Sequence, residues 1–156
     1  MARYRFLTAW CLEAPLDDVW AAIRDCEGWG RWWRGVERSE VVEHGDEEGI
    51  GVRVRCRWRG AVPYTVRFET ETIRVERPHV IELRASGELA GRGAWRFYEG
   101  DGTCVTYDWD VETTKTWMNA VAPAARSLFE WNHHVLMRRG GEGLARELGT
   151  RLVAAT

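Results

Sequence analysis

The sequence lacks the patterns that mark several classes of protein. No secretory-signal pattern begins the chain, and no apolar run approaches the ~20 residues of a membrane span. The four cysteines form no CxxC pair and have no regular spacing: Cys11, Cys26, Cys56 and Cys104. We therefore expect free thiols in a reducing cytosol, ahead of a metal or disulfide framework. The expected location is the cytoplasm, with no stable insertion into a membrane.

A charge excess of either sign is also lacking. Lysine and arginine number 22 against 24 acidic residues, for a formal net charge of −2. No large electrostatic term then favours nucleic acid or an anionic membrane, and we expect no nucleic-acid partner.

Catalytic and metal-binding constellations are sparse. The chain has no Ser-His-Asp arrangement, phosphate-binding glycine loop or metal-ligand cluster at a diagnostic spacing. Adjacent His133 and His134 would point about 100° apart on a helix, so both cannot readily ligate one metal. His44 and His79 lie in stretches typical of exposed loops. We expect no metal and no cofactor.

Tryptophan, by contrast, is abundant, with ten in 156 residues. A chain of this length suits one domain, residues 1–156, and can bury about 70% of its unfolded surface. Each aromatic ring buries on the order of 150–250 Å². This content indicates either a thick core or a large apolar cavity.

The N-terminal part predicts a strand followed by two short helices. Residues 4–13 alternate, and Pro15 suits the first turn of a helix that follows. A second short helix is predicted over 28–35, where Trp29, Trp32 and Trp33 fall at helical spacing. Interleaved arginines would let these rings stack on nucleobases. We favour a tryptophan wedge under the C-terminal helix.

From residue 36 onward the apolar period is two, which predicts antiparallel hairpins with one face buried. The strands are expected near 51–60, 64–72, 80–89, 93–98 and 104–113. Arginines at 53–59 would lie beside Glu69 and Glu71, and the acids at 108–112 beside Arg3 and Arg5. Cross-strand pairs of this kind help to fix register. A solvated sheet face is favoured over a basic stripe for nucleic acid.

The last segment, about 117–148, is predicted to be helical with two interruptions. Pro123 requires that the helix begin near it or kink, and Gly140 and Gly141 can bend or break it. The expected fold class is α+β: a curved seven-stranded antiparallel sheet gripping a long C-terminal helix, with two short helices between strands 1 and 2.

Three stretches carry a resemblance to a known family: APLDDVWAAIRD followed by WGRWWRGV, PHVIELRASGELAGRGAWRFYE, and FEWNHHVLMRRGGEGLARELG. Together they resemble the START-like, polyketide cyclase/dehydrase-type superfamily (SRPBCC), whose helix-grip fold also occurs in the birch pollen allergen. The resemblance implies a hydrophobic cavity between the sheet and the C-terminal helix. Its members include lipid and hormone binders, aromatase/cyclases and chaperone cofactors, so the fold alone selects no function.

A cavity of this kind would be lined by inward strand residues and by one side of the helix. The predicted ligand-binding residues are Trp58, Tyr64, Phe68, Leu83, Trp95, Phe97, Tyr107, Trp109, Phe129, Asn132, His133 and Leu136. In this interpretation apolar walls come from rings such as Trp95, Trp109, Phe68 and Phe129. Asn132, His133, Tyr107 and Tyr64 would orient one polar end.

Helical projection separates the polar residues of the stretch FEWNHHVLMRRGGEG. The apolar side holds Met118, Val121, Ala122, Ala125, Phe129 and Leu136. Asn132 falls among these residues and therefore needs a partner, either structural or a ligand group. His133 lies at the margin, and His134 faces solvent. His133 is the weak candidate for a catalytic acid or base.

Three functional hypotheses follow. The leading one is binding of a small hydrophobic, lipid-like or polyketide/aromatic ligand. The second is a cofactor-free cyclase, aromatase or dehydratase that uses the same cavity, with His133 and a tyrosine moving protons. The third is a protein-interaction module. The sequence leaves a homodimer open.

Overall fold

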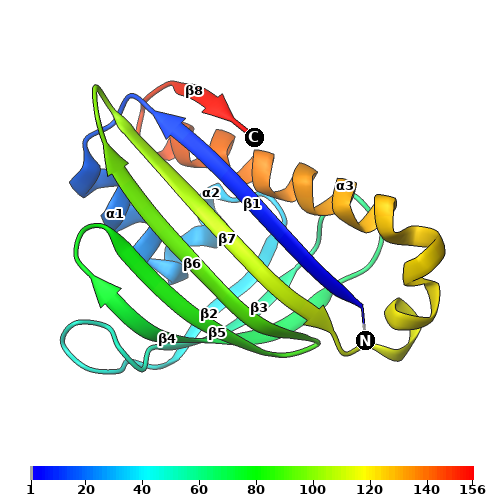
Figure 1. Cartoon of the computed structure of the whole chain (residues 1–156). Coiled ribbons are helices and arrows are strands. Elements are labelled where there is room, and N and C mark those ends of the chain that lie inside the picture. The colour runs from blue at the N-terminus through cyan, green and yellow to red at the C-terminus, as the bar shows by residue number, and fades with distance from the viewer. Residues whose placement is uncertain (1) are drawn as a thin grey trace.

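A single antiparallel sheet forms the frame of the molecule in the computed structural model, which describes residues 2–156. The strand order is β2-β3-β4-β5-β6-β7-β1-β8. The strands are β1 Arg3–Leu12, β2 Val36–Glu43, β3 Arg53–Trp58, β4 Val66–Glu76, β5 Val80–Gly87, β6 Leu89–Glu99, β7 Thr103–Thr113 and β8 Leu152–Ala155. The sheet curves around one long helix, α3 (Thr116–Glu147), as Figure 1 shows. The predicted α+β helix-grip architecture is confirmed.

Two short helices fill the connection between β1 and β2. They are α1 (Leu16–Arg24), preceded by Pro15, and α2 (Trp29–Trp32), with a 3-10 turn η1 (Cys26–Gly28) between them. In Figure 1 they lie behind the sheet, near the end of the molecule where α3 finishes. The prediction of two short helices after the first strand is therefore confirmed.

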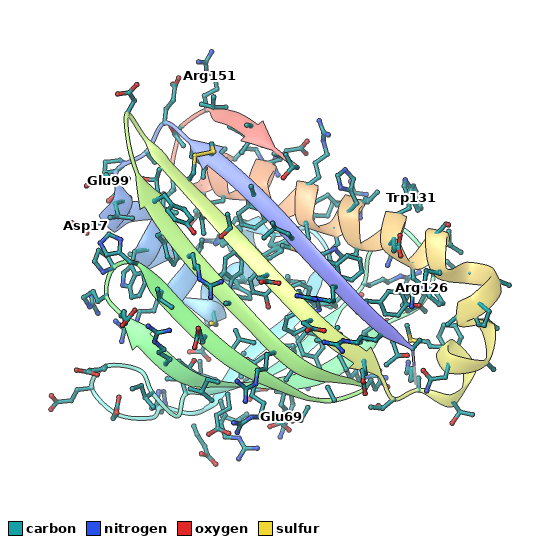
Figure 2. All side chains as sticks on the ribbon, in the orientation of Figure 1. Asp17, Glu69, Glu99, Arg126, Trp131 and Arg151 are labelled. Atoms are coloured by element: carbon teal, nitrogen blue, oxygen red, sulfur yellow. A yellow bond between two sulfur atoms is a disulfide. The ribbon has the colours of Figure 1, made fainter. Side chains whose placement is uncertain are left out.

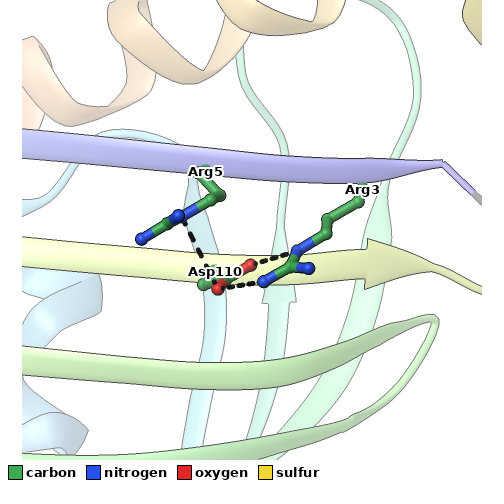
Figure 3. Close-up of polar contacts among 3 residues, drawn as sticks. All are labelled: Arg3, Arg5 and Asp110. Carbon is green, nitrogen blue, oxygen red and sulfur yellow. Dashed lines mark hydrogen bonds and ion pairs between the residues drawn. The ribbon is translucent and has the colours of Figure 1, made fainter.

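The alternating sequence pattern sets the two faces of the sheet. Along β7, odd-numbered residues from Val105 to Val111 are buried and the residues between them are half-buried. The predicted charge pairing on the outer face is present, because Arg5 lies opposite Asp110 and Arg53 opposite Glu71. Asp110 accepts hydrogen bonds from Arg3 and forms an ion pair with Arg5 at 3.6 Å, as drawn in Figure 3.

The sheet has one strand more than predicted. β8 pairs with the outer edge of β1, with Ala154 opposite Cys11. Its four residues read LVAA and show no alternation. Edge pairing uses main-chain groups, so a short strand of this kind leaves little trace in a hydrophobic pattern.

The expectation of four free thiols is wrong for two of them. Cys11 and Cys104 lie directly opposite each other in β1 and β7 and form a disulfide, the yellow bond in Figure 2. Their sequence separation of 93 hid this proximity, because only strand register brings the two cysteines together. Cys26 and Cys56 are free. The cytoplasmic location rested on free thiols, and it stays a prediction without that support.

The predicted tryptophan wedge, formed by Trp29, Trp32 and Trp33, is buried under α3. The Trp33 indole N–H donates to the Leu136 carbonyl of α3 at 2.9 Å. Rings that are at most 6% exposed cannot stack on nucleobases, so the structure supports the structural role of the wedge.

The helix α3 runs through both of its predicted interruptions. It continues past Pro123, and Figure 1 shows its first turns bending away from the axis of the rest. Gly140 and Gly141 do not break it. A Cβ on Gly140 would lie 2.5 Å from the Trp33 ring, and one on Gly141 would lie 2.8 Å from Trp10. These glycines therefore allow α3 to approach the tryptophans closely.

Across residues 2–156, no helix combines the length and apolar character that a membrane crossing demands.

Candidate functional site

An apolar pocket lies between the inner face of the sheet and the part of α3 that precedes the glycines. We call it the α3 pocket. Its volume is about 100 Å³, and its walls come from β1, β3, β4, β6, β7, the loop after β3, and α3. It is smaller than the ~300–1,000 Å³ of typical small-molecule sites. As it stands, it holds a group about the size of one small ring.

Nine of the twelve predicted ligand-binding residues line the α3 pocket. They are Trp58, Tyr64, Phe68, Tyr107, Trp109, Phe129, Asn132, His133 and Leu136. The structure brings them together because period-two strands and one side of α3 face the same space. Whether they contact a ligand stays a prediction.

The other three predicted residues lie elsewhere. Leu83 and Trp95 line a second cavity of about 90 Å³ between the sheet and the end of α1, and Phe97 packs edge-on against Trp20 at 5.0 Å. All three face inward as predicted, but Trp29 of the wedge lies 6.0 Å from Trp95 and lines the second cavity with it. The alternation predicted which residues lie on the inward face of the sheet. It could not predict where along that face a cavity lies.

Three side chains line both cavities: Trp58, Phe68 and Tyr107. They therefore separate the α3 pocket from the second cavity. Burial raises the pKa of the Tyr107 phenol well above its ordinary value, so the phenol stays protonated.

The predicted buried amide has structural partners. Asn132 is 6% exposed, and its Oδ1 accepts the Val62 backbone N–H at 3.0 Å. Its Nδ2 donates to the Tyr64 hydroxyl at 3.2 Å. Gly60 leaves room for this contact, since a Cβ there would collide with the amide. Tyr64 belongs to the loop of residues 59–65 and not, as predicted, to the strand, because β4 begins only at Val66.

His133 is half-buried in the pocket wall, with its ring stacked on Phe6 at 3.7 Å between centroids. Burial, assisted by the neighbouring His134, lowers the pKa of the His133 imidazole to about 3. An apolar surrounding disfavours the charged form, so His133 is a neutral imidazole near pH 7.

The helical projection is confirmed for most of α3 and wrong at one position. His134 is exposed, whereas Met118, Ala122, Phe129 and Leu136 are buried. Val121, predicted to face inward, is 41% exposed. The projection assumed one straight axis, and the bend at Pro123 turns the first part of the helix away from it.

Sequence reasoning missed several lining residues, above all Tyr4 and Phe6 on β1. The signal was present, because Tyr4 and Phe6 share the apolar face of the alternating stretch 4–13. Met118, from the first turn of α3, closes the same end of the pocket, where it forms an apolar cluster with Tyr4 and Phe129.

The two free thiols do not resemble nucleophiles. Burial raises the pKa of Cys26 to about 12 and raises that of Cys56 still further. A reactive cysteine requires a lowered pKa, so neither thiol is activated. Within residues 2–156, no group of three His, Cys, Asp or Glu side chains is placed to hold a metal ion.

Comparison with known proteins adds a family to this geometry. The model of the family described as polyketide cyclase / dehydrase and lipid transport matches residues 12–139. No curated protein matches the chain in sequence.

Solved structures share the fold. The Zhui aromatase/cyclase from a Streptomyces species aligns with a TM-score of 0.77 and 18% identity, over 95% of this chain and 94% of that one. The di-domain ARO/CYC protein BexL aligns with a TM-score of 0.74 and 18% identity, over 96% of this chain. The alignment spans only 51% of BexL, about half its length. A protein from Thermus thermophilus aligns with a TM-score of 0.67 and 24% identity, over 94% and 99% of the two chains.

Proposed function

The chain belongs to the polyketide cyclase / dehydrase and lipid transport family, and from this membership we propose that it binds a small, largely apolar molecule in the α3 pocket. The observation that carries the proposal is the pocket itself. It is lined mainly by aromatic and aliphatic side chains, with a few polar groups at fixed positions. Because β1 and β8, near the two ends of the chain, share one sheet, we also infer that residues 1–156 act as one domain.

The polar groups support binding over a solid core. A core filled for stability leaves few voids larger than a water molecule. Here a cavity of about 100 Å³ persists beside Asn132 and Tyr64, whose hydrogen bond fixes both groups in the wall. A ligand with one polar end would place that end beside this pair and its apolar part against Phe129 and Trp109.

A substitution that fills the α3 pocket without disrupting the fold would test the proposal. Val66 lines the α3 pocket at the start of β4, and Val66→Phe would place a ring in it. Exposed Val42 on β2 offers the matched control, Val42→Phe. We expect native mass spectrometry to find a retained apolar compound, and NMR titration to detect ethylbenzene, in the parent protein and in Val42→Phe but not in Val66→Phe. No retained compound from several expression hosts and no ethylbenzene shift would contradict the proposal.

The second candidate function is a cofactor-free cyclase, aromatase or dehydratase. It is favoured by the similarity in fold to the Zhui aromatase/cyclase along nearly the whole of both chains. The protonation state of His133 speaks against the simplest mechanism, because a general base works best when its pKa lies near the working pH. Binding therefore stays the leading function.

Turnover of a poly-β-ketone chain would test the enzymatic candidate. His133→Gln keeps hydrogen-bonding groups and removes the titration, so a proton-shuttling His133 predicts lost turnover with unchanged binding. Equal turnover in His133→Gln and in His134→Gln, the exposed neighbour, would exclude the assigned role.

The third candidate, an interaction module, predicts an exposed apolar patch, and α3 carries one. Four residues on one side of the helix are more than 40% exposed: Trp117, Val121, Leu128 and Trp131. Figure 2 shows Trp131 pointing away from the sheet. A helix with such an apolar stripe suits pairing with the same helix of a second copy, so we commit this candidate to a homodimer.

A further inference from the structure

Three arginines lie side by side on the outer face of the sheet, which is turned away from α3. Arg57 on β3 is directly opposite Arg38 on β2 and directly opposite Arg67 on β4. We call these three residues the arginine row. Like charges directly opposite each other destabilise a sheet, whereas Arg53 and Arg5 on the same face have carboxylates opposite them. The arginine row therefore costs stability and is not explained by the fold.

A surface hollow of about 250 Å³ opens beside the arginine row. Its charged lining residues are Arg38, Arg55, Arg57, Arg67 and Glu69. Three of these arginines are exposed, and Arg57 is half-buried. Figure 2 shows Glu69 on the side of the sheet away from α3. The hollow thus carries an excess of positive charge, although the whole chain has a formal net charge of −2.

A second hollow on the same face, of about 220 Å³, has balanced charges. Three arginines and three carboxylates line it: Arg5, Arg92, Arg96, Glu82, Asp108 and Asp110. We call it the balanced hollow. Arg92 is directly opposite Asp110, and Arg96 lies 3.6 Å from Glu82. The charge excess at the arginine row is therefore a local feature and not a general property of the outer face.

Two of the four arginines at the first hollow have no carboxylate partner. Arg55 and Arg67 form no ion pair among residues 2–156, and Glu69, which is opposite Arg55, pairs instead with Arg53 at 3.8 Å. A guanidinium group has five N–H donors in a planar fork that matches the oxygens of a phosphate. Donors at the hollow are therefore available to an anion from solution.

From this arrangement we infer that the arginine row binds the diphosphate group of a small phosphorylated molecule. Neighbouring strands lie about 4.8 Å apart, so the row spans about 10 Å. One phosphate can contact two of its guanidinium groups, and a diphosphate can contact all three. The carboxylates of Glu37, Glu40 and Glu69 lie beside the arginines and would repel the long backbone of a nucleic acid. The site is on the opposite face of the sheet from the α3 pocket and does not depend on the proposed function.

Titration with inorganic pyrophosphate, followed by NMR, tests the inference. Low ionic strength is needed, because salt at 0.1 M screens exposed charges within about 10 Å. Pyrophosphate should shift the Nε–Hε resonances of Arg57 and Arg67 to saturation, and KCl of equal ionic strength should not. Inorganic phosphate should bind about ten-fold more weakly, because it loses one arginine contact. Citrate, which carries its charges on carboxylates, should also bind more weakly. ADP and isopentenyl diphosphate share the diphosphate group and should shift the same resonances.

Four variants, two in each hollow, assign the site. Arg67→Gln removes a guanidinium group that has no ion pair among residues 2–156, so pyrophosphate affinity should fall about ten-fold. Arg92→Gln removes the same charge from the balanced hollow and should keep the affinity of the parent. Glu69→Gln should tighten binding, because this carboxylate lines the hollow, and Asp108→Asn in the balanced hollow should not.

Melting provides a second readout. Pyrophosphate should raise the melting temperature of the parent protein, and Arg67→Gln should reduce this rise without lowering the melting temperature of the free protein. Shifts that KCl reproduces, or equal affinities in the parent and Arg67→Gln, would overturn the inference. Equal affinities for citrate and pyrophosphate would overturn the assignment to a diphosphate. Tighter binding of a single-stranded oligonucleotide than of pyrophosphate would replace the small molecule by a nucleic acid.

Discussion

The two ends of the helix α3 meet the sheet in different ways. Its C-terminal part carries Gly140, Gly141 and Gly143 and packs directly against the tryptophans. Its N-terminal part carries Met118, Phe129 and Asn132 and stands over the α3 pocket. The C-terminal part of α3 therefore packs against the core, and its N-terminal part forms one wall of the pocket. The difference shows that side-chain size along α3 decides where an interior space remains.

The buried polar groups do not follow this division. At the packed end, the indole N–H groups of Trp29 and Trp33 donate to the backbone carbonyls of Ile23 and Leu136. At the pocket end, the Tyr4 hydroxyl has no partner in the described part of the chain. The Trp10 indole N–H, which lies against Gly141 at the packed end, also lacks a partner there, so buried donors without a partner occur at both ends of the helix.

The largest loss of stability is expected from adding a side chain at the packed end of α3. Gly143→Val would drive a Cβ into the Trp32 backbone carbonyl, which cannot move aside as a side chain can. We expect a loss of at least about 3 kcal/mol in the free energy of unfolding, measured by urea denaturation.

Two alanine substitutions serve as controls for this prediction. Gly143→Ala gains about 1 kcal/mol in helix propensity, so a net loss would isolate the collision. At Gly100, in the turn after β6, an added Cβ would meet nothing within 4 Å, and Gly100→Ala should change stability by less than about 0.5 kcal/mol. An unchanged stability of Gly143→Val would show that the two helix ends do not differ in packing.

At the pocket end, the amide of Asn132 joins α3 to the loop after β3. Asn132→Ala leaves the Val62 N–H without its acceptor and releases Tyr64, at a cost of about 1–3 kcal/mol. Chemical denaturation measures the loss, and NMR titration with ethylbenzene should show weaker binding in parallel. His134→Ala, on the exposed side of the same helix, is the control and should alter neither. Full stability in Asn132→Ala would contradict the role assigned to the amide.

Acid should weaken the pocket end through His133. Burial holds the pKa of the folded imidazole at about 3, below the ~6.5 of an unfolded histidine. Below pH 6.5 the unfolded chain takes up a proton that the folded chain does not, so stability is complete above that pH and falls as the pH drops toward 3. Between pH 7 and pH 5 the fall should be about 2 kcal/mol.

Denaturation at a series of pH values checks this slope. His133→Gln should remove most of it, and His134→Gln should retain it, because His134 is exposed. The same slope in both variants would assign the acid sensitivity to another group.

The smallest effect on stability is expected on the outer side of α3. Trp131 is 52% exposed, so Trp131→Glu should change the free energy of unfolding by less than about 0.5 kcal/mol. If the exposed stripe joins two copies, light scattering should show a dimer for the parent protein and a monomer for the variant. A parent protein that is monomeric at high concentration would exclude the homodimer.

Much of the fold could be predicted from local pattern. Period-two alternation from Arg53 to Thr113 identified the inward face of each strand, and nine predicted residues meet in one pocket. The pattern could not show that Trp95 lines a separate cavity, since that depends on Trp29, which lies far earlier in the chain and 6.0 Å away in space. It also could not show that Asn132 would find Val62 and Tyr64.

The sequence by itself determined the α+β class, the curved sheet with its long helix, the wedge, and the burial of Asn132 against the exposure of His134. These features follow from spacing within one element, where 3.6 and 2.0 residue periods fix which side chains share a face. Only the tertiary structure decided the Cys11–Cys104 disulfide, the division of the interior into two cavities, and the unpaired donors of Tyr4 and Trp58 within residues 2–156. Each depends on strand register or on close contact between distant segments, and no local period encodes either.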